Sequence, residues 1–262
     1  MDIEKIRKFE RCGIEANFGL PECTWIDNKN LVMNITENTQ GSASNCVYRS
    51  IFEKKDLESK VGEIINKFAK HNLNYRWHIS PLTEPANTES YLKSLGMKEL
   101  YKATTMIKAS SQEFSSDVSN IKVKTAEMND SELFSKIFIK AWGLDDSHFD
   151  EINSTFLYSL GTNINFKPYI AYYKNEPAAC STMIFTSNGA YLASGTVLKE
   201  FRNNRIYKAM VEKRSIEANI NGIDTLVIQA KENTSKPICL KMGFEEIYTY
   251  TVLEKATLPK AL

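Results

Sequence analysis

The sequence predicts an α/β fold of the α+β kind, made of two mixed-sheet units in tandem, of which the first is shortened. Three observations support this prediction. Strand-like and helix-like stretches alternate along most of the chain, a sequence repeat links its two halves, and a polar stretch separates them. With 262 residues, the chain is long enough to bury one large core or two ordinary ones.

The repeat appears when Gly96 is placed on Gly243, an offset of 147 residues. Residues 91–109 (YLKSLGMKELYKATTMIKA) then lie over residues 238–256 (ICLKMGFEEIYTYTVLEKA), with six identical positions that include the glycine. The same offset places Lys55 on Arg202, so the starts of the two preceding helices also align. We therefore predict two copies of one α/β unit.

The polar stretch 110–120 is the one plausible linker, because it is short and lies where one pattern ends and the next begins. It divides the chain into a first unit, residues 1–109, and a second unit, residues 121–262. In the first unit we expect an amphipathic helix at 1–12, a weak strand at 31–35, a polar loop at 41–44 and a strand at 46–51. A helix at 56–70, a strand at 75–79, a short helix at 88–95 and a strand at 101–107 follow.

The second unit begins with a strand at 121–124, followed by a helix at 133–142 for which Asn129 and Glu132 give a start signal. A helix at 149–160 and three strands joined by tight turns come next, at 168–173, 178–185 and 190–198. A turn then leads into a long helix ended by Asn221-Gly222. The last elements are a strand, a short helix and a strand, at 225–228, 237–242 and 248–253.

The turn before the long helix has the features of an anion site. A strand that leads directly into a helix N-terminus leaves backbone N–H groups unpaired and concentrates positive charge there. The first turn, Arg202-Asn203-Asn204-Arg205, carries two cations and no carboxylate. The equivalent turn of the first unit, Lys55-Asp56-Leu57-Glu58, carries two carboxylates that would repel a phosphate. We therefore expect anion binding in the second unit alone.

The composition disfavours several other classes of protein. A net charge of +1 gives no electrostatic case for nucleic acid or an anionic membrane, and no stretch has the ~18 uncharged apolar residues of a membrane span. The N-terminal segment lacks the apolar core of a signal peptide. Five cysteines without a CxxC pair favour a reducing cytoplasm, and three scattered histidines predict no metal site. The motifs GxGxxG after a strand, GxxxxGK[ST] and GxSxG are missing.

This order of elements resembles the GNAT superfamily of CoA-dependent N-acyltransferases. The resemblance covers residues 120–256 well and 25–109 more loosely, where Trp77, Pro81 and Leu95-Gly96-Met97 look like the degenerate first half of tandem GNAT proteins. It implies acetyl-CoA as co-substrate. The residues implied to contact CoA are Val197, Leu198, Arg202, Asn203, Asn204, Arg205, Ile206, Tyr207 and Asn233.

Two departures from the family pattern stand out. The family's phosphate turn reads Arg/Gln-x-x-Gly-x-Gly/Ala, whereas this chain has Arg205 and Tyr207 in place of both glycines. Arg205 would either pair with a phosphate or block the groove. In "KPICLKMGF", residues 236–244, Cys239 replaces the tyrosine that protonates the leaving thiolate in the family. Cys239 is thus a candidate acid or, alternatively, a small buried apolar residue.

The resemblance also implies direct attack of an amine on the thioester. Tyr191 lies near the place where some relatives carry a general base, and its alternative role is packing on a half-buried strand. The loop with Asp145, Asp146 and His148 lies where the family forms its acceptor pocket, or it is simply solvated. Tyrosines at 169, 172 and 173 line that pocket or pack the sheet.

Two functions follow from this reading. The first is an N-acetyltransferase acting on a primary amine of a small molecule or peptide, with neither nucleic acid nor membrane as a partner. The second is a non-catalytic member of the same fold that binds acyl-CoA as a regulator, or serves as an interaction module. The sequence leaves the acceptor and the oligomeric state open.

Overall fold

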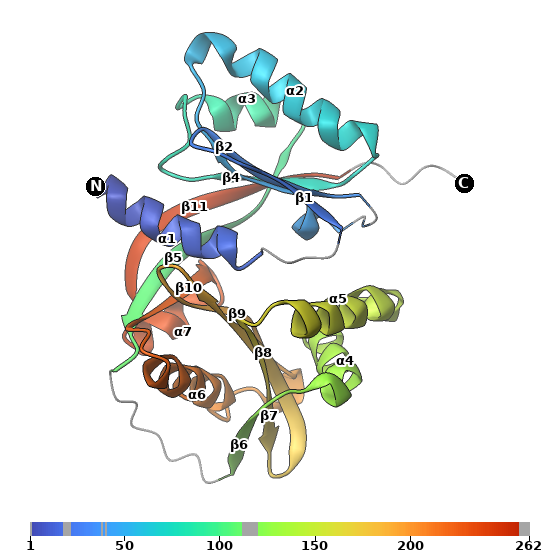
Figure 1. Cartoon of the computed structure of the whole chain (residues 1–262), viewed down its shortest axis with the longest axis vertical. Helices are drawn as coiled ribbons and strands as arrows, with labels where there is room; N and C mark the ends of the chain where they lie inside the picture. Colours follow the sequence, from blue (N-terminus) through green and yellow to red (C-terminus); the bar gives the residue numbers. More distant parts are fainter. Residues whose placement is uncertain (1, 18–21, 38, 40, 112–119, 257–262) are drawn as a thin grey trace.

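The computed structural model describes residues 2–17, 22–37, 39, 41–111 and 120–256. In this part of the chain, eleven strands form one mixed sheet in the order β1-β2-β3-β4-β11-β5-β10-β9-β8-β7-β6 (Figure 1). Seven α-helices cover the sheet, so the predicted mixed α/β fold is confirmed. None of the described helices is both long and apolar enough to cross a membrane.

The first half contains three helices and five strands. In chain order they are α1 (Ile3–Glu15), β1 (Cys23–Asp27), β2 (Leu31–Thr36), β3 (Cys46–Ser50), α2 (Leu57–Lys70), β4 (Tyr75–Ile79), α3 (Thr88–Ser94) and β5 (Lys98–Ala109). Helix α2 places Leu57, Val61, Ile64 and Phe68 at three- and four-residue spacing against the sheet, where they pack around Trp77. The first half therefore has a core of its own under α2 and α3.

The second half contains four helices and six strands. They are β6 (Ile121–Thr125), α4 (Ser131–Trp142), α5 (Phe149–Thr162), β7 (Phe166–Tyr173), β8 (Glu176–Thr186), β9 (Gly189–Val197), α6 (Ile206–Ile220), β10 (Thr225–Lys231), α7 (Lys236–Lys241) and β11 (Glu245–Lys255). Helices α4 and α5 cover one face of this part of the sheet, and α6 and α7 cover the other (Figure 1). Helix α1 packs through Phe9 and Cys12 on Ile184, Tyr191 and Val227 of the second half.

The two halves exchange their last strands. Strand β11, from the second half, lies between β4 and β5 of the first, and β5 in turn pairs with β10 of the second. Strands β5 and β11 carry the repeated segments found in the sequence, and they lie antiparallel to each other at the centre of the sheet. As a result Leu253 of β11, opposite Trp77 in register, belongs to the core beneath α2. The predicted boundary at 110–120 remains a prediction, and residues 112–119 lie outside the described residues.

Most predicted elements are present, with different ends. Gly96, Gly222 and Gly243 all have positive φ, between 72° and 84°, as expected where a helix ends in a left-handed residue. The start signal predicted for α4 was wrong, because Glu127 and Asp130 cap each other's backbone and the helix begins at Ser131. Strand β1 was missed, and the predicted polar loop at 41–44 contains a 3₁₀ turn, Ser42–Ser44.

Candidate functional site

Strands β9 and β10 separate from each other part of the way along, and this opening is the central feature of the site. They pair in parallel at three positions only, Ala190 to Leu192 of β9 with Leu226 to Ile228 of β10. Beyond these positions β9 continues along β8 to Val197, while β10 continues along β5 to Lys231. The facing edges of the two strands therefore offer backbone donors and acceptors to a third, extended group. We call this opening the wedge.

A β-bulge lies in β9 where the wedge begins. Two residues, Ser194 and Gly195, face the single residue Ser181 of β8, and Ser194 has a φ of 53°. A bulge bends its strand and increases the local twist, so it turns β9 away from β10 at this point.

The turn between β9 and α6 keeps left-handed backbone at two non-glycine residues. Asn203 has a φ of 69°, and Arg205, the N-cap of α6, has a φ of 60°. Arg202 Nε donates to the carbonyl of Val197 at 3.2 Å, and the Asn204 side-chain amide donates to the carbonyl of Phe201 at 3.1 Å. These bonds brace a conformation that glycine would adopt without steric cost.

The start of α6 is open to a ligand. Arg205 provides no side-chain cap, and the first turn of the helix holds no acidic residue. The side chains of Arg202, Asn203 and Arg205 are exposed, so Arg205 projects into solvent instead of being buried in the groove. The N-terminus of α6 thus combines uncapped N–H groups with two exposed guanidinium groups.

Tyr207, by contrast, fills space beside the wedge. A Cβ atom added to Gly195 would lie 2.9 Å from Cε2 of the Tyr207 ring, so the ring lies directly on this glycine. The phenol of Tyr207 also hydrogen-bonds the thiol of Cys239 on α7. The tyrosine therefore spans from β9 to α7 on the face of the sheet that α6 covers.

The two predicted catalytic residues lie on opposite faces of the sheet. Cys239 is buried in the core beneath α6, and burial raises the pKa of its thiol to about 11. Tyr191 packs with α1 on the other face, and its hydroxyl donates to Gln229 Oε1 at 2.9 Å. Burial also raises the pKa of Tyr191. Both groups are protonated at neutral pH, and their catalytic roles remain predictions.

A cavity of about 620 Å³ lies between the two halves, on the α4 and α5 side of the sheet. Its lining includes Ala193 and Ser194, so it reaches the bulge where the wedge begins. Aromatic rings form much of its wall: Tyr48, His78 and Tyr101 from the first half, and Phe134, Phe138, Phe156, Phe166 and Tyr191 from the second. We call it the interdomain cavity.

The predicted pocket residues are only partly brought together in this cavity. Of the predicted pocket residues, His148 lines it, as does Tyr191, which was predicted as a general base, whereas Asp145 accepts a hydrogen bond from the backbone N–H of Ser147. Tyr169 is buried in the core beneath α6, and Tyr172 packs in the cluster under α4 and α5. Asn233, predicted to contact CoA, is exposed in the turn after β10.

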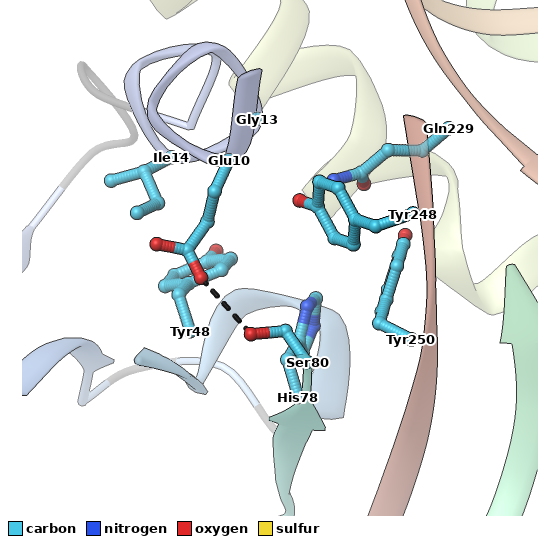
Figure 2. A pocket seen from close by; sticks show the side chains of 9 residues that line it. All are labelled: Glu10, Gly13, Ile14, Tyr48, His78, Ser80, Gln229, Tyr248 and Tyr250. Atoms are coloured by element: carbon cyan, nitrogen blue, oxygen red, sulfur yellow. Dashed lines mark hydrogen bonds between the residues drawn. The ribbon is translucent and has the colours of Figure 1, made fainter. Parts of the chain in front are cut away.

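A second, much smaller void of about 10 Å³ adjoins the cavity, since Tyr48, His78 and Gln229 line both. Figure 2 shows Glu10 of α1 reaching toward Ser80, with Tyr248 and Tyr250 of β11 on the opposite side. The volume of this small void is about that of one water molecule. Burial, helped by the nearby charge of Arg76, lowers the pKa of His78 to about 3, so this imidazole is neutral at physiological pH.

Sequence reasoning missed the contribution of the first half to the site. Arg76 and His78 alternate along β4, as Cys46 and Tyr48 do along β3, and alternation places each pair on one face of the sheet. This signal was present in the sequence, but its meaning depends on the cavity that the other half completes. In the described part of the chain no cluster of histidine, cysteine, aspartate or glutamate could hold a metal ion.

Neither a family model nor a curated protein matches the sequence. Solved structures do match. A GCN5-related N-acetyltransferase from Kribbella flavida superimposes with a TM-score of 0.71 at 12% identity, covering 98% of this chain and 97% of that one. One from Sphaerobacter thermophilus gives a TM-score of 0.63 at 13% identity, covering 88% and 82%. A tandem GNAT protein from the clavulanic acid biosynthesis pathway gives 0.60 at 9% identity, covering 96% and 89%.

These matches run over nearly the whole chain, including the strands that the two halves exchange. They confirm the resemblance predicted from the sequence at the level of the fold. The chain therefore has the mixed α/β fold of the GCN5-related N-acetyltransferases, and one of its structural neighbours is a tandem GNAT protein.

Proposed function

We propose that this protein is an N-acyltransferase that transfers an acyl group, preferably acetyl, from acyl-CoA to a primary amine of a small molecule or peptide. The observation that carries the proposal is the wedge between β9 and β10. It opens beside the uncapped N-terminus of α6, and the interdomain cavity reaches its bulge from the opposite face. A donor and an acceptor can thus approach one point from two directions.

We propose the following positions for the predicted CoA contacts. Val197 and Leu198 would lie along the pantetheine arm. Because the Leu198 N–H already donates to the Ala178 carbonyl and the Val197 carbonyl accepts from Arg202 Nε, backbone pairing at this point would require Arg202 to release Val197. The diphosphate would lie on the first-turn N–H groups of α6, from Ile206 onward, with Arg202, Asn203, Asn204 and Arg205 around it. Asn233 would approach the cofactor from the β10 side. We further propose that residues 121–262 form the catalytic unit, and that residues 1–109 contribute the other wall of the acceptor cavity.

The chemistry is attack of a neutral amine on the thioester carbonyl. A C–N bond forms, the C–S bond breaks, the amine loses a proton, and the sulfur leaves as a thiolate that is then protonated. Cys239 is a poor donor for that last step. With a pKa of about 11, it is a weaker acid than an ordinary thiol of pKa ~8.5, and the transfer is unfavourable by about 3 kcal/mol. We therefore assign the rate enhancement mainly to positioning of amine and thioester.

Tyr207 favours a second candidate function, a non-catalytic protein of the same fold. Tyr207 stands where the family motif has a glycine or alanine, and its ring lies on Gly195. If the ring stays there, the thioester arm loses room beside β9, and the interdomain cavity becomes the main ligand site. The cytoplasm is the location we propose in either case, because all five cysteines are free thiols.

A thermal-shift titration with acetyl-CoA separates these functions. Binding to the folded state stabilises it by RT ln(1 + [L]/Kd), about 2.7 kcal/mol at a hundredfold excess over Kd. We expect the wild type and the control Asp56→Ala to shift equally, and Arg205→Glu to lose the shift. Arg202 is less suitable for this test because its side chain also braces the turn.

The Tyr207→Gly variant tests the second function. If the wild type shows no shift at millimolar acetyl-CoA and Tyr207→Gly does, the tyrosine closes the wedge and the protein is non-catalytic as it stands. If neither protein shifts, CoA binding is refuted. If the wild type shifts, release of free CoA thiol in the presence of an amine panel then tests for acyl transfer.

A further inference from the structure

The interdomain cavity contains a cation that protein groups satisfy poorly, and this points to the chemistry of its ligand. Arg76, on β4, lines the cavity and keeps 23% of its side chain exposed. Its Nε atom is buried and has no hydrogen-bond partner within the described residues. Oε1 of Glu254 lies 3.5 Å from this Nε, and the same oxygen accepts a hydrogen bond from the Ser42 hydroxyl. Tyr101 also hydrogen-bonds the Arg76 side chain, so a ligand would meet the exposed part of the guanidinium and not its buried Nε. An anion entering the cavity could pair with that exposed part.

A second cation, Lys231, lies near Arg76 but is not among the residues that line the cavity. Lys231 of β10 lies with its Nζ 4.6 Å from the ring centre of Tyr101 and 5.0 Å from that of Trp142. Burial, and then repulsion from Arg76, lower the pKa of Lys231, so the two cations lie close enough to influence each other. Glu254 is the carboxylate paired with Arg76 here, whereas Glu151 lines the cavity from α5 and accepts a hydrogen bond from Thr39.

The walls indicate a singly charged, partly apolar ligand. The rings of Tyr48, Tyr101 and neutral His78 lie on the first-half side, and Phe134 and Phe156 lie on the second-half side. Such walls solvate a dianionic phosphate poorly, while one guanidinium fork suits a carboxylate. We therefore propose that the interdomain cavity recognises an elongated amino carboxylate, with its carboxylate on Arg76 and its amine toward Ser194. That this ligand is the acyl acceptor rests on the proposed function, whereas the proposed binding of the ligand does not.

The strand order sets the required length. Arg76 is on β4 and Ser194 is on β9, which are four neighbouring-strand steps apart. At ~4.8 Å per step, four steps between paired strands amount to about 19 Å. The reach of the arginine and the bending of the sheet shorten this span, and the opening between β9 and β10 lengthens it. An α-amino acid carries both groups on one carbon and cannot reach both ends. A dipeptide, at most ~7 Å long, is also too short, whereas an extended peptide of about four residues, ~13–14 Å long, with a free N-terminus and a free C-terminus can.

Calorimetric titration without CoA tests the inference. The probes are the tetrapeptide Ala-Ala-Ala-Phe, its C-terminal amide, and alanine, at pH 7.5. We expect the tetrapeptide to bind at least tenfold more tightly than the amide and than alanine. Arg76→Gln should abolish the preference for the acid, and Arg76→Lys should retain part of it. Lys67→Gln is the matched control, because it removes one positive charge from the exposed side of α2 and should change nothing.

Three results would overturn the inference: no binding of the tetrapeptide, equal binding of acid and amide, or an undiminished acid preference in Arg76→Gln. A thermal melt of each variant checks folding, and Arg76→Lys keeps the test decisive if the glutamine variant unfolds. Because acetyl-CoA is left out, a carboxylate preference without acyl transfer would refute the proposed enzyme and leave the inference intact.

Discussion

Substitution of Leu253 by alanine tests the exchange of strands between the two halves. Leu253 is completely buried, and although it comes from the C-terminal strand it packs in the core of the first half. A buried leucine-to-alanine change typically costs 2–5 kcal/mol, so we expect a loss of about 3 kcal/mol in the free energy of unfolding. For a chain of this size, that corresponds to a fall in melting temperature of about 6–12 °C.

Hydrogen exchange locates the effect. Because β11 completes the sheet beneath α2, we expect amide protection across Leu57–Lys70 to fall in Leu253→Ala, although helix and substitution lie in different halves of the sequence. Leu192→Ala, in the core beneath α6, is the matched control and should affect β9 and β10 first. Unchanged protection of α2 in Leu253→Ala, together with a loss confined to the second half, would refute the strand exchange.

Two further predictions concern buried titratable groups in the first half. His78 has a pKa of about 3 in the folded protein and ~6.5 when unfolded, so the unfolded state takes up the proton first and stability falls as pH decreases. Between pH 7.5 and 5.5 this histidine lowers the free energy of unfolding by about 1.4 kcal/mol. In urea unfolding, His78→Phe should lack this part of the pH dependence. Glu10 pairs with Arg49 at 2.6 Å, both largely buried. Glu10→Gln should lower the free energy of unfolding by about 3 kcal/mol, and adding Arg49→Met should restore part of the loss; equal stability of the single variant and the wild type would contradict this.

Local patterns predicted most of the elements but could not predict how the sheet is assembled. The range predicted for β4, 75–79, matches the structure, because alternating apolar residues and flanking polar turns define it locally. The missed strand β1 has no fully buried residue, so its sequence shows no clear pattern. The position of β11 between β4 and β5 depends on pairing between distant segments, and no local signal encodes it. The repeat did identify β5 and β11 as equivalent, which their central pairing reflects.

The site was predictable where it depends on local backbone and not where it depends on assembly. The N-terminus of α6 could be found from Arg202 to Arg205, because a strand, a turn and a helix start are adjacent in sequence. The persistence of left-handed backbone at Asn203 and Arg205 without glycine was not foreseen. Arg76 became notable only when its neighbours were known, because an unsatisfied donor is a property of the folded surroundings and not of the residue type.

The interleaved order of strands has a consequence for biosynthesis. A nascent chain emerges from the ribosome N-terminus first, yet β4 and β5 cannot gain their shared neighbour until residues 245–255 have been made. At ~5–20 residues per second, the delay after β5 is on the order of ten seconds. During this interval the hydrogen-bonding edges of two strands and the apolar underside of α2 lack their final cover, so the early half is the part of the molecule most in need of a chaperone.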